Sequence, residues 1–154
     1  MGCLQTMWFS RKQGVSPAGG AAPSTKRMGD AAEDRALAHL QAQGLGLVQR
    51  NFRTPGRGGG ELDLIMRERD GTLVFVEVRH RTSARQGGAA ASITVQKQRR
   101  IVFAARHFLL RLGSEPPCRF DVVLIQGDTR AQASTAQAVS VEWIRAAFDA
   151  SAHG

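Results

Sequence analysis

Residues 61–79 read Glu-Leu-Asp-Leu-Ile-Met-Arg-Glu-Arg-Asp-Gly-Thr-Leu-Val-Phe-Val-Glu-Val-Arg, two β-rich runs joined by the turn signal Arg-Asp-Gly. A two-residue turn would put Asp63 and Glu77 on opposite faces of the hairpin. A three-residue loop with Gly71 in the left-handed conformation places Asp63 directly opposite Glu77, because side chains alternate between the faces. We expect the three-residue loop, because it also gathers the apolar residues on the other face: Leu62, Leu64, Met66, Val74, Val76 and Val78.

Two opposed carboxylates destabilise a sheet unless something neutralises them. One of the pair can be protonated, Arg79 can compensate both, or a divalent cation can lie between them. Mg²⁺ suits the third arrangement, because it takes one or two carboxylates and leaves its other positions to water and phosphate oxygens. The alternative is a solvent-exposed polar face in which Glu61 lies opposite Arg79, and the sign pattern alone does not separate the two.

Glu33 belongs to the first predicted helix, which the sequence starts at Asp30 and ends at Gly44. As the partner of Asp30, Glu33 has the spacing of a capping box. It also lies four residues before Leu37, so it projects on the buried stripe of the helix. A carboxylate that points inward needs a partner. The hydrogen-bond network of a metal site would provide one.

The remaining elements complete an α/β fold with a central mixed β-sheet flanked by helices, in the order α-β-β-β-α-β. Asp121 alternates with apolar neighbours on a strand, so we expect it to make a structural hydrogen bond rather than to serve as a third ligand. A disordered basic leader (1–28) and a disordered tail (150–154) are expected to flank a single domain (29–149). The other predicted elements are a strand at 45–53, a helix at 94–112, a strand at 119–125 and a terminal helix at 141–148.

The charge distribution indicates a polyanionic partner. The chain carries a net charge of +8, and the segment between Glu77 and Glu115 contains eight bases and no acid. Two cysteines cannot build a disulfide framework or a zinc cluster, which suits the reducing cytoplasm. No apolar run approaches the length of a membrane span, so no membrane partner is expected.

Taken in order and spacing, five motifs resemble the YraN-like branch of the PD-(D/E)XK nuclease superfamily. The resemblance implies a restriction endonuclease-like core in which Asp63 is the first metal-binding aspartate, Glu77 the second carboxylate and Glu33 a supporting glutamate. Arg79 stands where the family pattern has lysine, and arginine can stabilise charge but cannot serve as a base. The motifs are Gly29-Asp-Ala-Ala-Glu33-Asp34, Asn51-Phe52-Arg53, Gly60-Glu61-Leu62-Asp63-Leu64-Ile65, Phe75-Val76-Glu77-Val78-Arg79 and Arg119-Phe120-Asp121-Val122-Val123.

The leading hypothesis is a metal-dependent endonuclease that hydrolyses phosphodiester bonds in DNA, branched or processed, by analogy with junction resolvases. Mg²⁺ or Mn²⁺ would be held by Asp63 and Glu77, and Glu33 and Arg79 would complete the catalytic set. The alternatives are a non-catalytic nucleic-acid-binding module with the same fold and a basic protein–protein adaptor. The sequence does not decide whether the nucleic acid is DNA or RNA, and it leaves the oligomeric state open, with a homodimer as one option. The expected contacts to the nucleic-acid backbone come from Arg81, Arg85, Lys97, Arg100 and Arg111.

Overall fold

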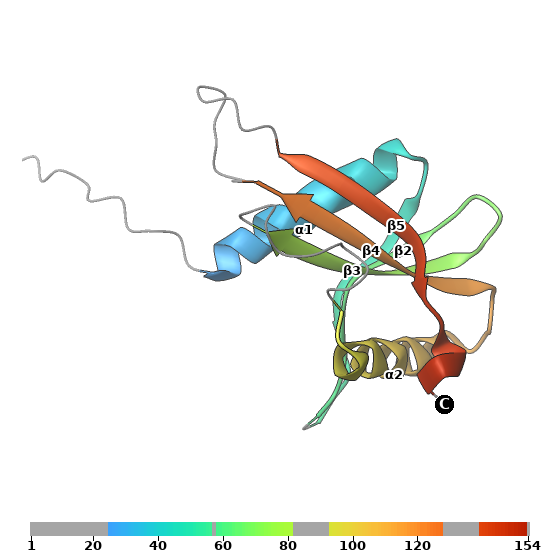
Figure 1. The fold of residues 1–154 in the computed structure, drawn as a ribbon. Coiled ribbons are helices and arrows are strands. Elements are labelled where there is room, and N and C mark those ends of the chain that lie inside the picture. The colour runs from blue at the N-terminus through green and yellow to red at the C-terminus, as the bar shows by residue number, and fades with distance from the viewer. Residues whose placement is uncertain (1–24, 57, 82–92, 128–138, 154) are drawn as a thin grey trace, which may run out of the picture.

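The computed structural model describes residues 25–56, 58–81, 93–127 and 139–153. Its elements follow the expected order of one helix, three strands, one helix and one strand, and a further strand comes after them (Figure 1). They are helix α1 (Thr25–Ala42), strands β1 (Gly46–Arg53), β2 (Glu61–Arg67) and β3 (Leu73–Arg81), helix α2 (Val95–Leu112), strands β4 (Cys118–Gln126) and β5 (Ser140–Phe148), and the 3₁₀-helix η2 (Ala150–His153).

The five strands form one mixed sheet in the order β1-β2-β3-β4-β5. Strands β3 and β4 run parallel, and every other neighbouring pair is antiparallel. Helix α2 is the crossover that a parallel pair requires. The α/β fold class is therefore confirmed, and the mixed sheet with its two helices is consistent with a restriction endonuclease-like core.

The β2–β3 hairpin has the predicted three-residue loop. Leu64 pairs with Val76 and Met66 with Val74. The loop is closed by the backbone hydrogen bond from Glu68 N–H to the Thr72 carbonyl, and Gly71 has the left-handed φ of +93° that the turn requires.

The predicted positions of Leu62 and Glu61 are wrong, because strand β2 changes direction at Asp63. The β2–β3 ladder ends at Leu64, and Asn51 on neighbouring β1 has a φ of +50°. Beyond this point Leu62 packs into the cluster under α2, not onto the face that holds Leu64. Glu61 consequently does not face Arg79. Its carboxylate accepts hydrogen bonds from Arg53 at 2.7 and 2.9 Å.

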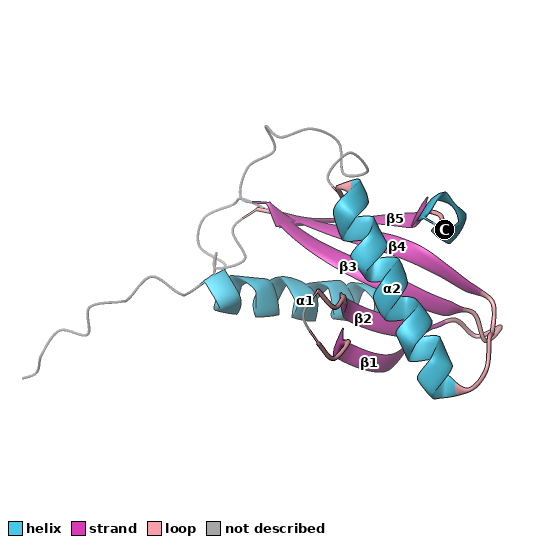
Figure 2. Cartoon of the chain, turned by 90° about the horizontal axis from the view of Figure 1, so that it is seen from below, coloured by secondary structure: helices cyan, strands magenta, loops and turns pink. Residues whose placement is uncertain are grey.

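Both faces of the sheet are covered, each by one helix. Helix α1 packs on one face through Ala32, Ala36 and Leu40, and α2 packs on the other through Ile101 and other buried residues. Figure 2 shows α2 running across the strands. None of the described helices is long and apolar enough to span a bilayer. Side chains on both faces of the central strands are therefore buried, including the face that carries Glu77.

Gly60 lets α2 approach the start of β2 closely. A Cβ atom at this position would collide with the backbone carbonyl of Arg100 and lie 2.9 Å from the Cβ atom of Ala104. The N–H of Gly60 donates to the hydroxyl of buried Thr54 at 2.7 Å, which ties the β1–β2 loop to the same place. The absence of a side chain at residue 60 therefore sets the spacing between α2 and the sheet.

Three predicted boundaries are wrong. Helix α1 begins at Thr25, so Asp30 lies within the helix, and the capping box with Glu33 does not exist. Residues 141–148, predicted as a helix, belong to strand β5 and pair with β4. Residues 150–153, predicted as a disordered tail, form η2 beside α2 (Figure 1). Residues 1–24 of the predicted leader lie outside the described residues.

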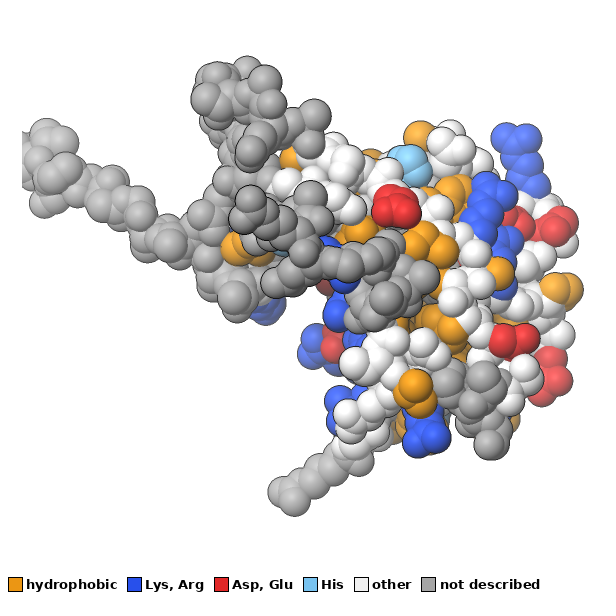
Figure 3. All heavy atoms as spheres, in the orientation of Figure 1, with side chains coloured by type: hydrophobic (Ala, Val, Ile, Leu, Met, Phe, Trp, Pro, Cys, Tyr) orange, Lys and Arg blue, Asp and Glu red, His pale blue; other side chains and the backbone are white. Residues whose placement is uncertain are grey.

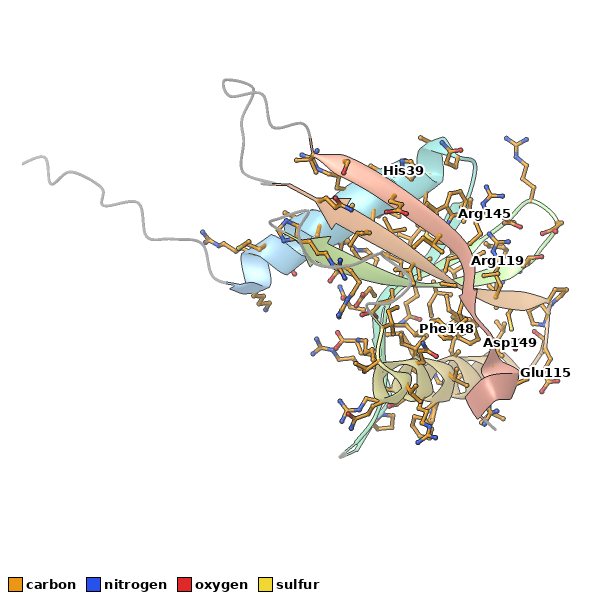
Figure 4. The ribbon with its side chains drawn as sticks, in the orientation of Figure 1. His39, Glu115, Arg119, Arg145, Phe148 and Asp149 are labelled. Atoms are coloured by element: carbon orange, nitrogen blue, oxygen red, sulfur yellow. The ribbon has the colours of Figure 1, made fainter. Side chains whose placement is uncertain are left out.

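Asp121 has the structural role that the strand pattern predicts. It is fully buried and accepts hydrogen bonds from Arg119 Nε, Trp143 Nε1 and the N–H of Ala146 at 2.9–3.2 Å. Ala146 has a left-handed φ of +48°, and the β4–β5 register shifts between Phe120 and Val122. Figure 4 shows the labelled Arg119 and Arg145 on these neighbouring strands. Asp121 therefore fixes the bend in β5.

We expect Asp121→Asn to lower the free energy of unfolding by about 2–4 kcal/mol, because an amide cannot accept from all three donors and leaves Arg119 without its buried partner. Urea denaturation followed by circular dichroism measures this. Glu142→Gln, at an exposed position on β5, is the matched control and should change stability by less than about 0.5 kcal/mol. Equal stability of the two variants would contradict the assigned role.

Candidate active site

Asp63 and Glu77 meet where strands β2 and β3 separate. Glu77 is buried on β3, and Asp63 is half-buried on β2. Asp63 Oδ2 accepts a hydrogen bond of 2.8 Å from the N–H of Val78, the residue after Glu77. The bend in β2 thus turns the Asp63 carboxylate into the space that continued strand pairing would fill, and the two acids lie beside each other.

The environment of this pair disfavours two negative charges. Burial, and then the neighbouring Asp63, raise the pKa of Glu77 to about 7. Burial also raises the pKa of Asp63, and the hydrogen bond from Val78 opposes that shift. The site therefore holds less than two full negative charges near neutral pH unless a cation is present.

Two basic side chains approach Glu77 from different elements. Lys97 Nζ, from the first turn of α2, lies 3.1 Å from Glu77 Oε2. Arg79 Nη1, from β3 itself, lies 3.7 Å from Glu77 Oε1. Their side chains are 32% and 40% exposed, so both reach from the buried carboxylate toward the surface.

Glu33 points inward from α1, as its position on the apolar stripe predicts. Its side chain is 15% exposed, and Arg50 Nη2 lies 3.7 Å from Oε2. Within the described residues this oxygen is buried and has no hydrogen-bond partner. The pKa of Glu33 is raised by burial first and by Asp63 second, and a hydrogen bond with the Asn51 side chain opposes the shift. Glu33 is therefore an electrostatic neighbour of Asp63.

An open pocket of about 650 Å³ lies between the N-terminal half of α1 and the β1–β2 hairpin. Of the candidate site residues, Glu33 lines this pocket, and the basic side chains of Lys26 and Arg53 stand on its wall. Its lining residues are Lys26, Gly29, Asp30, Glu33, Asn51, Arg53 and Glu61.

The donor set fits a hard cation. Among the described residues no three His, Cys, Asp or Glu side chains are arranged to hold a metal ion. Asp63 and Glu77 supply two carboxylates, the number that Mg²⁺ takes when water and phosphate oxygens fill its other positions. Burial raises the pKa of both acids, and Asp63 raises that of Glu77 further, so a cation between them would remove repulsion.

The other basic residues predicted to bind nucleic acid are dispersed. Arg100 and Arg111 are exposed on α2, and the Arg111 guanidinium lies 5.7 Å from the centre of the Phe52 ring. Figure 3 shows basic side chains on the part of the surface where α2 lies. Arg81 ends β3, where its carbonyl accepts from the N–H of Gly127. Arg85 lies outside the described residues.

The proximity of Lys97 to Glu77 was missed by the sequence reasoning, although a signal for it exists. Lys97 precedes buried Ile101 by four residues, so it lies on the face of α2 that packs on the sheet. Glu33 likewise precedes an apolar residue of its helix, Leu37, by four positions. Thr94, the N-cap of α2, accepts a hydrogen bond from the backbone N–H of Lys97 and fixes that turn.

Comparison with known proteins places the chain in a bacterial family. The model of the uncharacterised protein family UPF0102 matches residues 32–125. The chain is 59% identical over 155 residues to the UPF0102 protein of Polaromonas naphthalenivorans, covering 94% of this chain and all of that protein. It is 61% identical to the UPF0102 protein of Paracidovorax citrulli, covering 94% and 99% of the two chains. The matched region contains Glu33, Asp63, Glu77 and Lys97, and the chain belongs to the UPF0102 (YraN-like) family.

Proposed function

We propose that this protein is a metal-dependent endonuclease of the PD-(D/E)XK type that hydrolyses phosphodiester bonds in DNA. The observation that supports the proposal is the pair formed by half-buried Asp63 and buried Glu77, approached by Glu33 from one helix and by Lys97 from the other. Acids and bases from four separate elements converge there. A site that served stability alone would be better filled with apolar side chains.

Asp63 and Glu77 would hold Mg²⁺ or Mn²⁺, which when bound polarises the phosphate, generates hydroxide and stabilises the leaving oxygen. Arg79 extends from Glu77 toward solvent and offers a permanent positive charge to a phosphate oxygen. Glu33 shapes the electrostatics of Asp63 from the pocket side. The two carboxylates are the more buried groups, as ligands of an enclosed cation would be, and Arg79 is the more exposed group, as a contact to a phosphate requires.

The nucleic-acid part of the proposal is supported by the charge of the chain and by exposed arginines on α2. Contacts to phosphates supply affinity without sequence information, which suits a substrate recognised by its structure, such as branched or processed DNA. A cytoplasmic location is part of the proposal, because DNA is found there. A binding module without catalysis is the second candidate, since arginine replaces the lysine of the family pattern on β3.

The first prediction of the proposed function concerns metal and pH. The pKa of Glu77 is raised, so the folded state binds its proton more tightly than the unfolded state does. Its contribution should lower the free energy of unfolding as pH rises from about 4.5 to about 7, with a slope of roughly 1 kcal/mol per pH unit. Millimolar Mg²⁺ should restore stability above pH 7, since it binds only the native pair.

Differential scanning calorimetry of the wild type and of Glu77→Gln at pH 6 and pH 8 measures this effect. The variant should lose the metal-dependent rise in melting temperature and should be less sensitive to pH in this range. If millimolar Mg²⁺ or Mn²⁺ does not change the melting temperature of the wild type at pH 8, the proposed metal site is contradicted.

The second prediction concerns cleavage. Asp63→Asn and Glu77→Gln should each reduce the single-turnover rate with Mg²⁺ by at least about 100-fold, because each removes a charged metal ligand. Glu142→Gln, exposed on β5, should cut like the wild type. The substrates are a four-way junction, a flap and a linear duplex, with EDTA as the metal-free control. Wild-type protein that binds these DNAs but cuts none with either metal would favour the binding module.

The third prediction concerns the grip on DNA. Arg100→Ala combined with Arg111→Ala should weaken binding similarly for all sequences and reduce the slope of log affinity against log salt by about two. Arg67→Ala combined with Arg69→Ala, at exposed positions where β2 enters the β2–β3 turn, is the charge-matched control, with an expected slope like that of the wild type. Fluorescence anisotropy with EDTA gives the slopes. An unchanged slope in the double variant would exclude this face of α2 from the interface.

A further inference from the structure

Glu77 has a different cation at each of its carboxylate oxygens. Arg79 approaches Oε1 at 3.7 Å and belongs to the same strand, whereas Lys97 approaches Oε2 at 3.1 Å and comes from α2. The shorter contact is therefore made by the residue that lies twenty positions further along the chain. The two cations also differ in chemistry, since an ammonium is a compact point charge and a guanidinium is a planar, delocalised one.

The place of Lys97 is determined by the packing of α2. Gly60 allows the backbone of α2 to contact the start of β2, and the Thr94 cap holds the first turn. Ile101, one turn after Lys97, is buried in the sheet-facing cluster. The packing of α2 therefore fixes the backbone of Lys97 next to Glu77.

The ammonium of Lys97 can donate hydrogen bonds to other groups besides Glu77. An ammonium carries three N–H donors, and within the described part of the chain its ion-pair partner is one oxygen of Glu77. With a third of the side chain exposed, the remaining donors can meet a water molecule or a phosphate oxygen next to the carboxylate pair. A lysine that served only to neutralise Glu77 would not need that exposure.

We propose that Lys97 is a second catalytic cation of this site, beside Arg79, and that it orients the attacking water and stabilises the negative charge that grows on the phosphate. This inference rests on the proposed function. In the reaction the water oxygen forms a bond to phosphorus and the bond from phosphorus to the leaving oxygen breaks. One water proton is released to solvent, and the leaving oxygen takes up a proton, so that one water is consumed per cut.

The cleavage rate and the affinity for DNA distinguish a catalytic Lys97 from one that only binds the phosphate backbone. A lysine that only grips the backbone supports binding before and during the reaction, so its loss weakens affinity. A lysine that acts on the transition state changes the rate of the bound complex and leaves ground-state affinity nearly unchanged. A lysine that only neutralises Glu77 changes the melting temperature and leaves the rate at saturating metal unchanged.

The test compares Lys97→Met with Arg99→Met, a neighbour that is exposed on the same turn of α2 and carries the same charge. Three quantities are measured: the single-turnover cleavage rate at saturating protein and Mg²⁺, the Kd for the same DNA in EDTA, and the melting temperature. For Lys97→Met we expect a rate lower by about 10²–10³-fold and a Kd within about threefold of the wild type. For Arg99→Met we expect a rate within about threefold of the wild type.

A Lys97→Met rate within about threefold of the wild type would overturn the inference, as would a tenfold weaker Kd with an unchanged rate. If Lys97→Met does not fold, Lys97→Arg keeps the charge beside Glu77. It should lose at least about tenfold in rate, because a planar guanidinium does not place a compact donor at the water. A full rate in Lys97→Arg would also overturn it. A wild type inert with both metals is a different result: the proposed function then fails, and the inference with it.

Discussion

The burial of the Glu77 carboxylate beside Asp63 is the constraint on which the candidate site depends. Two acids held in a place of low dielectric repel each other, and the protein surrounds them with an amide from β3 and basic side chains from β3 and α2. Each of these partners requires a particular backbone feature. The bend at Asp63 turns one acid inward, and the position of α2 brings Lys97 close. The geometry of the candidate site therefore follows from how the sheet is bent and covered.

Much of this arrangement could be predicted from the sequence. The hairpin register follows from the loop length and from the need to keep Leu64, Met66, Val74 and Val76 on one face, and the structure has that register. The inward direction of Glu33 follows from its spacing to Leu37. The change of face at Leu62 could not be predicted, because it depends on a left-handed Asn51 in a neighbouring strand.

Strand β5 shows the limit of periodicity as a guide. Val141, Ile144 and Phe148 recur at helical spacing, yet the segment pairs with β4. The pattern resembles that of a helix because both faces of β5 contact the core: Val141 packs against the cluster on the α1 side, whereas Ile144 and Phe148 pack against the cluster on the α2 side. The contact between Lys97 and Glu77 is hidden for a different reason. Lys97 stands in a basic segment, which predicts a surface position, and only its spacing to buried Ile101 indicates the sheet-facing side of α2.

Gly60 limits which amino-acid substitutions this fold can accept beneath helix α2. The helix that it admits carries both Lys97, beside the carboxylates, and Arg100, on the solvent face. Any side chain at residue 60 must push that helix outward, since the obstacle is backbone that cannot rotate away. Such a shift would move both bases together, so a substitution at residue 60 would change the contact with the carboxylates and the exposed basic face at the same time. A substitution along the helix, in contrast, can change one of these two features and leave the other in place.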